Sequence, residues 1–173
     1  RTHDWFEEKA NHIKSWLLEH LQSQSGVFGS SMDAEALGEE GRPYVWSWAS
    51  VSAILGEDLD EAKHYFNWEK PKNINEPCLI LDTIQLEEKV FDDKVIARIL
   101  SALKIARQEM PQTRVDDKAI LDWHMALIAS MAKASLAFKD ASWLELAKKT
   151  YLACETIFYI DGRWHHAARH NQL

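Results

Sequence analysis

The sequence lacks a basic block, a long apolar run and the short motifs of several enzyme classes. Acidic residues outnumber basic ones by 27 to 20, which argues against nucleic acid or an anionic membrane as a partner. No apolar run approaches the ~18 residues of a membrane-spanning helix, and no signal-peptide pattern opens the chain. Cys-x-x-Cys, a P-loop, Gly-x-Gly-x-x-Gly and a Gly-x-Ser-x-Gly elbow are absent as well, so composition alone names no chemistry.

Cysteine and histidine are not spaced as they are in metal or redox sites. Cys78 and Cys154 lie far apart in apolar segments, where we expect buried thiols. That usage fits a reducing compartment, so we expect a cytoplasmic protein. His165, His166 and His170 follow an Asp-Gly-Arg-Trp turn, but no Cys or His pair at zinc spacing lies upstream. The sequence therefore predicts neither a metal site nor a cofactor.

The chain has a globular composition with helical periodicity. Hydrophobic residues make up 46% of its 173 residues and charged residues 27%, enough for one domain with a real core. Apolar residues at helical spacing predict long helices over 4–22, 92–109, 116–137 and 141–159. Residues 119–132 are apolar nearly all round, which predicts a helix surrounded by other helices. In the first helix the expected inward stripe is Phe6, Ala10, Ile13, Leu17 and Leu21.

Shorter elements are expected between the first two long helices. Two strands, at 26–33 and 42–46, are joined like a hairpin by the Gly-bearing connection 37–41. A short helix capped by Ser47 and stopped by Gly56 follows, then a second short helix over 59–66 and a strand over 78–81.

Two of the long helices have similar ends. The first leads into Gly26 and Phe28 and the fourth into Gly162 and Trp164, so each is closed by glycine and followed by an aromatic residue. We therefore expect a mainly α fold, an array of antiparallel helix pairs with short β-hairpin insertions, as a single helical domain over 1–173. The chain begins with Arg1, so we expect a piece of a longer protein, although processing would leave the same ends.

The strongest group of chemically useful side chains lies where the third long helix is expected to begin. Asp116 is a good N-cap and Asp117 falls in the first turn, so both carboxylates, with Lys118, stand at the mouth of the surrounding helices. Asp117 and His124 would lie two turns apart on one face, as an acid/base pair under a sugar stacked on Trp123. The alternative is that the acids cap the helix and His124 is a satisfied core histidine.

A second group combines Asp33 with Tyr44 and Trp46. Aromatic rings beside a carboxylate suit a pyranose, whose CH face stacks while its hydroxyls bond to charged acceptors. Two carboxylates would also serve glycoside hydrolysis, at a spacing that the sequence does not give. The alternative is that the rings fill core between strands and helices.

The same segments match the motifs of a known family. The family's G-x-F-x-S-x-x-D-A-(D/E), E-G-x-(F/Y)-Y-V-W and L-G patterns correspond to residues 26–35, 40–46 and 55–56. A later pattern around R-x-x-D-D-K is matched by Arg114, Asp116, Asp117, Lys118, Trp123, Ile128, Ala132, Lys133 and Ala134. With these motifs the chain resembles the thioredoxin-domain-containing proteins related to spermatogenesis-associated protein 20. It departs from them at His124, where the family has Asn, and at Pro43, which replaces an aromatic residue.

The resemblance implies a fold and an ancestry. The family joins a thioredoxin-like domain to an (α/α)6 toroid of the six-hairpin glycosidase and N-acylglucosamine 2-epimerase type, so this chain would cover part of the toroid and none of the thioredoxin-like domain. Related toroids bind sugars in a central cavity, which implies binding, isomerisation or hydrolysis of a carbohydrate. Asp117 and His124 would then be catalytic, and the ligand would meet Asp33, Tyr44, Trp46, Asp116, Lys118 and Trp123.

A second hypothesis belongs to another class of protein. The chain would be a non-catalytic interaction or scaffold domain, in which the same residues cap helices and fill core. The sequence leaves this choice open, and with it whether the chain is an enzyme. In both cases helix faces that neighbours normally bury would meet water, so we expect self-association through them.

Overall fold

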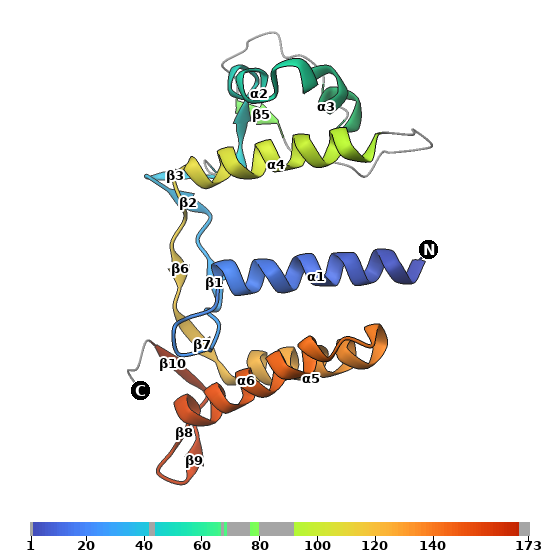
Figure 1. The fold of residues 1–173 in the computed structure, drawn as a ribbon. Coiled ribbons are helices and arrows are strands. Elements are labelled where there is room, and N and C mark those ends of the chain that lie inside the picture. Colours follow the sequence, from blue (N-terminus) through green and yellow to red (C-terminus); the bar gives the residue numbers. More distant parts are fainter. Residues whose placement is uncertain (1, 42–43, 67, 69–76, 80–91, 170–173) are drawn as a thin grey trace. The chain divides into compact units, whose positions relative to one another are not determined.

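The computed structural model describes residues 2–41, 44–66, 68, 77–79 and 92–169, and it is mainly helical, as expected, with short antiparallel strands (Figure 1). The contacts divide the chain into two compact units. Unit 1 comprises Arg1–Asp33 and Arg114–Leu173, and unit 2 comprises Ala34–Thr113. The helices are α1 (Thr2–His20), α2 (Trp48–Leu55), η2 (Gly56–Asp58), α3 (Leu59–Tyr65), α4 (Asp93–Glu109), α5 (Leu121–Phe138) and α6 (Ala141–Phe158).

In unit 1, α5 and α6 pack against each other as an antiparallel pair. The short connection between them predicts this arrangement. Lys139 adopts a left-handed conformation at φ 55°, which ends α5. Asp140 then caps α6, its Oδ1 accepting from Ser142 N at 2.8 Å. The turn therefore reverses the chain within a few residues, and α6 returns along α5.

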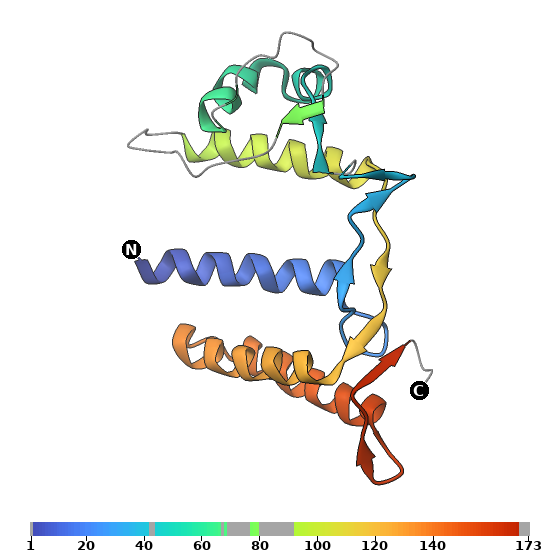
Figure 2. The ribbon, with the colours of Figure 1, turned by 180° about the vertical axis from the view of Figure 1, so that it is seen from behind.

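Helix α1 lies along this pair (Figure 2). Ala10 and Leu17 of this helix, and Leu21 directly after it, pack against the core that Phe28, Met131, Trp143 and Ala147 form. Lys14 reaches over the ring of Trp143, with Nζ 4.4 Å from the ring centroid. The predicted inward stripe is thus confirmed for those three residues. It is wrong for Phe6 and Ile13, whose side chains are 56% and 61% exposed.

Short strand pairs frame the end of unit 1 where α5 begins. β1 (Ser31–Met32) pairs with β6 (Val115–Asp116), β7 (Lys118–Ile120) with β10 (Ala167–Arg169), and β8 (Tyr159–Ile160) with β9 (Arg163–Trp164). The expected hairpin between 26–33 and 42–46 is therefore wrong, because β1 pairs with a strand distant in the sequence. Composition indicates a strand but not its partner.

These pairings also correct the predicted start of the third long helix. Periodicity placed that start at Asp116, but α5 begins after Ile120, which is extended at φ −118° and ψ 120°. The residues before it donate and accept in the β1–β6 and β7–β10 ladders instead. Asp117 therefore does not share a helix face with His124. Nor is the apolar part of α5 surrounded on all sides, since Trp123 is 58% exposed and Ala126 and Ala129 are exposed as well.

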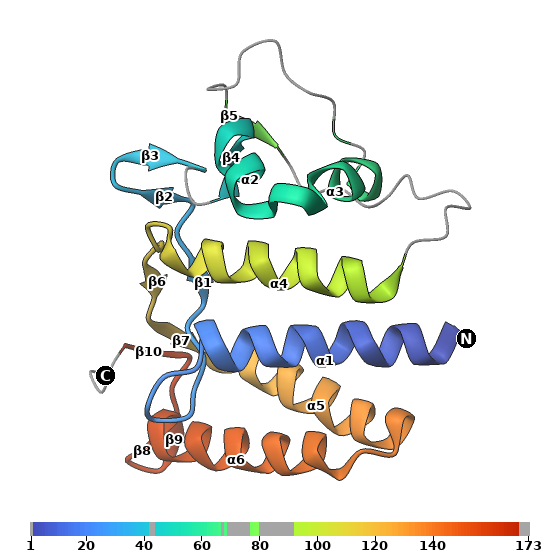
Figure 3. The same cartoon turned by 45° about the horizontal axis from the view of Figure 1, so that its top comes forward.

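In unit 2, α2 and α3 lie over α4 (Figure 3). Ser47 caps α2, accepting from Ser50 N at 3.1 Å, and Gly56 closes it, as predicted. A hairpin joins β2 (Glu35–Ala36) to β3 (Glu39–Glu40), and β4 (Trp46–Ser47) pairs with β5 (Pro77–Leu79). The core contains Trp46, Trp48, Val51, Leu55, Ala62, Phe66, Trp68, Ile96, Ile99 and Leu103. Residues 42–43 of one predicted strand and 80–81 of another lie outside the described residues.

Candidate functional site

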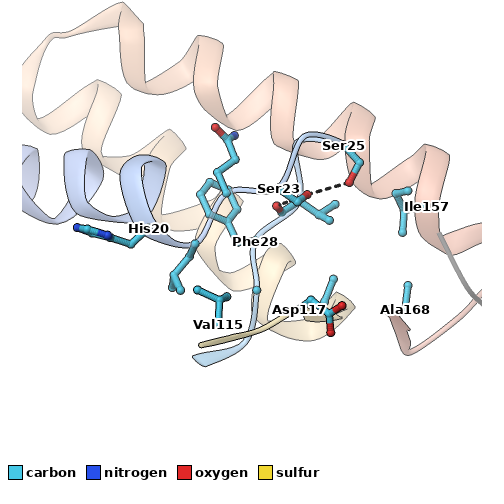
Figure 4. A pocket seen from close by; sticks show the side chains of 13 residues that line it. His20, Ser23, Ser25, Phe28, Val115, Asp117, Ile157 and Ala168 are labelled. Atoms are coloured by element: carbon cyan, nitrogen blue, oxygen red, sulfur yellow. Dashed lines mark hydrogen bonds between the residues drawn. The ribbon is translucent and has the colours of Figure 1, made fainter. Parts of the chain in front are cut away.

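A pocket of about 240 Å³ lies in unit 1, between the loop that follows α1 and the strands that lead into α5 (Figure 4). Its walls come from the end of α1 and that loop, from β6 and β7, from the end of α6 and from β10. The lining residues are His20, Leu21, Gln22, Ser23, Ser25, Val27, Phe28, Gly29, Val115, Asp117, Ala119, Ile157 and Ala168. Polar and apolar side chains therefore share one small cavity.

The loop after α1 is a tight turn that only glycine permits at its tip. Ser23 N donates to Val27 O at 2.8 Å, and Gly26 N donates to Ser23 O at 3.0 Å. Gly26 has a φ of 89°, and a Cβ added there would stand 3.1 Å from Ala153 Cβ of α6. Glycine is favoured at this position both because φ is positive and because a Cβ would crowd Ala153, so the turn packs closely against α6.

The two serines of this loop present hydrogen-bond acceptors. Ser23 Oγ donates to Val27 O at 2.9 Å, which uses its single hydrogen. Ser23 Oγ and Ser25 Oγ are 2.8 Å apart, so Ser25 must be the donor of that second bond. Both hydroxyl hydrogens are therefore engaged within the loop, and the lone pairs of Ser25 remain for a ligand that donates.

Asp117 brings a carboxylate to the pocket from the link between β6 and β7. Arg169 of β10 stands beside it, with Nε 3.7 Å from Asp117 Oδ1 and Nη2 3.5 Å from Asp116 Oδ1. Asp116 is not an N-cap of α5: its Oδ1 accepts from Lys118 N at 3.1 Å. That bond, with the nearby charges of Lys118 and Arg169, lowers the pKa of Asp116 below its usual value. Of these three consecutive residues only Asp117 is among those that line the pocket, and they lie in two strands and the link between them instead of in a helix.

His124 lies inside the unit and is not among the residues that line the pocket. Its ring is 3% exposed. Nε2 accepts from Phe28 N at 2.8 Å, and Nδ1 lies 2.7 Å from Ile120 O. Burial lowers the pKa of His124, partly offset by its hydrogen bond to Ile120. Both ring nitrogens are engaged by backbone groups, which is the satisfied core histidine of the alternative interpretation.

The remaining predicted site residues lie at different places. Trp123, in the first turn of α5, is 58% exposed, and Asp33 is an exposed residue whose N donates to Arg114 O at 2.7 Å. Tyr44 and Trp46 belong to unit 2, where Trp46 is part of the core. Tyr44 is exposed, with the Arg107 guanidinium 5.1 Å from its ring centroid.

Sequence patterns did not single out most of the pocket. Ser23 and Ser25 sit in an ordinary polar turn, and His20 ends an amphipathic helix, so none carries a motif of its own. Ile157 ends α6, far from the others in sequence. The sequence feature that points to the pocket is the pair of glycines at 26 and 29. It predicts a tight loop, but it does not indicate which elements the loop packs against.

The chain matches none of the protein-family models, and none of the curated proteins, with which it was compared. Within the described residues no three His, Cys, Asp or Glu side chains are grouped so that they could hold a metal ion. None of the described helices combines the length and the apolar character needed to cross a membrane.

Proposed function

We propose that the chain is part of a carbohydrate-handling helical toroid and that the pocket beside Asp117 binds a sugar. A cavity of about 240 Å³ is smaller than the ~300–1,000 Å³ of sites for drug-sized ligands, and it suits a monosaccharide. The observation that carries the proposal is the meeting of a carboxylate, two acceptor hydroxyls and an aromatic wall in this one cavity.

The chemistry of the lining favours a neutral ligand rich in hydroxyl groups. Asp117 and Ser25 offer acceptors, which match the O–H donors of a polyol. Phe28 and Val27 form an apolar wall, against which the CH face of a pyranose would pack. The lining includes the Asp117 carboxylate and neither Lys nor Arg, so a neutral polyol suits it better than a phosphate or carboxylate ligand.

Within this proposal the site binds, and no reaction is assigned to it. His124 would act as a general acid or base only if a ring nitrogen reached the ligand. In the structure its nitrogens bond to Phe28 N and Ile120 O. Asp117 therefore serves as the ligand-binding carboxylate, and His124 supports the loop.

The toroid and the compartment are parts of the same proposal. The support for a toroid is the resemblance, the antiparallel α5–α6 pair and the strands gathered where α5 begins. The support for the cytoplasm is Cys154, a buried thiol whose pKa burial raises to about 11, which leaves it unreactive.

A second candidate function is a non-catalytic interaction or scaffold domain. This alternative is favoured because two residues predicted to have a chemical role make structural hydrogen bonds. Asp116 Oδ1 accepts from Lys118 N, and His124 Nε2 accepts from Phe28 N. In that case the pocket would be a packing defect with no ligand.

Isothermal titration calorimetry of the chain against a panel of monosaccharides and disaccharides tests the proposal. We expect one or more monosaccharides to bind, and Asp117→Asn to weaken binding about 10- to 100-fold, since a hydrogen bond to a charged group contributes ~1.5–3 kcal/mol. Glu155→Gln, an exposed charge change on α6, is the matched control and should leave binding unchanged. If no sugar binds, the proposal fails and the scaffold alternative stands.

A further inference from the structure

The loop that forms one wall of the pocket is hydrogen-bonded to a side chain of α5, His124. Within the loop, the N–H groups of Ser23, Gly26 and Gly29 all donate to nearby carbonyls. Phe28 N instead donates to His124 Nε2 at 2.8 Å, a residue far along the sequence. His124 thus anchors the residue that supplies the aromatic wall.

The two bonds of His124 fix which nitrogen carries the proton. Ile120 O can only accept, so Nδ1, 2.7 Å away, must bear the hydrogen. Phe28 N–H can only donate, so Nε2 must be bare. The arrangement needs a neutral ring, because a proton added to Nε2 would point directly at the Phe28 N–H. Protonation would leave a buried backbone donor without its acceptor.

The described surroundings of the ring are aromatic and apolar, which disfavours a positive charge on it. The rings of Phe28 and Phe158 lie 6.1 Å and 5.7 Å from it, centroid to centroid. From α6, the titratable group in the adjoining apolar cluster is the neutral thiol of Cys154. The charged side chains on its own and neighbouring elements are all half-buried or exposed: Asp122 and Lys133 on α5, Glu145, Lys148, Lys149 and Glu155 on α6, Asp116, Asp117 and Lys118 in the strands and link before α5, and Arg169 on β10.

We propose that His124 is a proton-sensitive clamp that positions the pocket loop: the neutral ring holds Phe28 in place, and protonation releases the loop and weakens binding at the pocket. Its effect on binding rests on the proposed function, whereas the clamp itself does not. Because burial disfavours the charged ring, its pKa in the folded chain lies below the usual value of 6.5. The clamp is therefore complete above pH 6.5, and it is lost as the pH falls through the lowered pKa.

Nuclear magnetic resonance of the ligand-free chain between pH 8 and pH 5 tests the clamp. At pH 8 we expect the ring nitrogens to report the tautomer with hydrogen on Nδ1. As His124 titrates, the hydrogen-exchange protection of the Phe28 amide should fall by roughly tenfold or more, the effect of an unpaired buried donor. The amide of Ala147, inside α6, should keep its protection. A ring protonated on Nε2 at pH 8, or a Phe28 amide that ignores the titration, would overturn the proposal.

His124→Gln separates the clamp from mere packing. Glutamine places Oε1 near the position of Nε2 and can accept from Phe28 N, but it does not titrate. The Phe28 amide should therefore stay protected across the whole pH range in this variant. If it lost protection with pH as the parent chain does, another group would be responsible.

Sugar affinity measured at pH 7.5 and at a pH below the midpoint of the His124 titration then links the clamp to the pocket. The parent chain should bind several-fold more weakly at the lower pH, and His124→Gln should bind equally at both values. Equal affinities in the parent chain would overturn the coupling. Absence of sugar binding at every pH would refute the proposed function alone, since the Phe28 amide decides the clamp without a ligand.

Discussion

At the scale of single residues, the two most informative side chains are used for structure. His124 and Asp116 carry the chemistry that sequence patterns value, a titratable ring and a carboxylate. Each accepts a hydrogen bond from a backbone N–H: His124 Nε2 from Phe28 N, and Asp116 Oδ1 from Lys118 N. Buried or half-buried N–H groups need acceptors, and polar side chains supply them. Asp117 differs, because its carboxylate borders a cavity.

Among the glycines, Gly29 is the position at which adding a methyl group should destabilise the fold most. A Cβ added there would stand 2.7 Å from Val115 Cγ1 and 2.8 Å from Asp116 O, closer than such atoms approach. Gly29→Ala must push β1 away from β6, and we expect it to lower the free energy of unfolding by about 1–3 kcal/mol. Urea denaturation checks this. Ser31→Ala, an exposed neighbour, should change stability by less than about 0.5 kcal/mol. Equal effects of the two changes would contradict the close approach.

At the scale of elements, the sequence predicts features that depend on neighbouring residues, but not the pairing of distant segments. Ser47 and Gly56 bound α2 as predicted, because capping depends on residues next to one another. The start of α5 was misplaced because residues 115–120 bond to β1 and β10. The anchor from His124 to Phe28 was missed for the same reason. Sequence periodicity does not contain the partner strand or the distant loop.

In helix α2, replacing two different serines by alanine should have different effects on stability. Ser47 Oγ caps the helix, so Ser47→Ala should cost about 1 kcal/mol of stability. Ser52 Oγ is buried and has no hydrogen-bond partner among the described residues. Ser52→Ala removes that unpaired group and adds a better helix former, so it should leave stability unchanged or raise it. Thermal unfolding of both variants measures the two effects. A loss of stability in Ser52→Ala as large as that in Ser47→Ala would contradict the prediction.

At the scale of the whole molecule, α1 has more apolar surface than its own core covers. Ala10, Leu17 and Leu21 pack inward. On the adjoining side of the helix, Trp5 and Trp16 remain 53% and 44% exposed. Together with Phe6 and Ile13 they make up four large, exposed apolar side chains on one helix, the apolar sector of α1.

We expect a second copy of the chain to cover this sector of α1. Trp5 and Trp16 stand near its two ends, so two antiparallel copies would bring each ring opposite the other's, as a two-fold interface requires. Sedimentation velocity over a rising concentration series should show a dimer, and Trp16→Lys should shift it to monomer. Leu136→Lys, on exposed α5, is the control and should leave the dimer intact. A parent chain that stays monomeric at high concentration contradicts the expectation.

The account depends above all on whether the pocket beside Asp117 takes a sugar. Chemical-shift mapping of the amide spectrum during titration with each monosaccharide of the panel measures this most directly, because it reports place as well as binding. We expect one sugar to shift the amides of Ser25, Phe28 and Asp117 together, in unit 1, and to leave those of α4 unmoved. A spectrum unchanged by every sugar, or shifts confined to residues away from the pocket, would contradict the account.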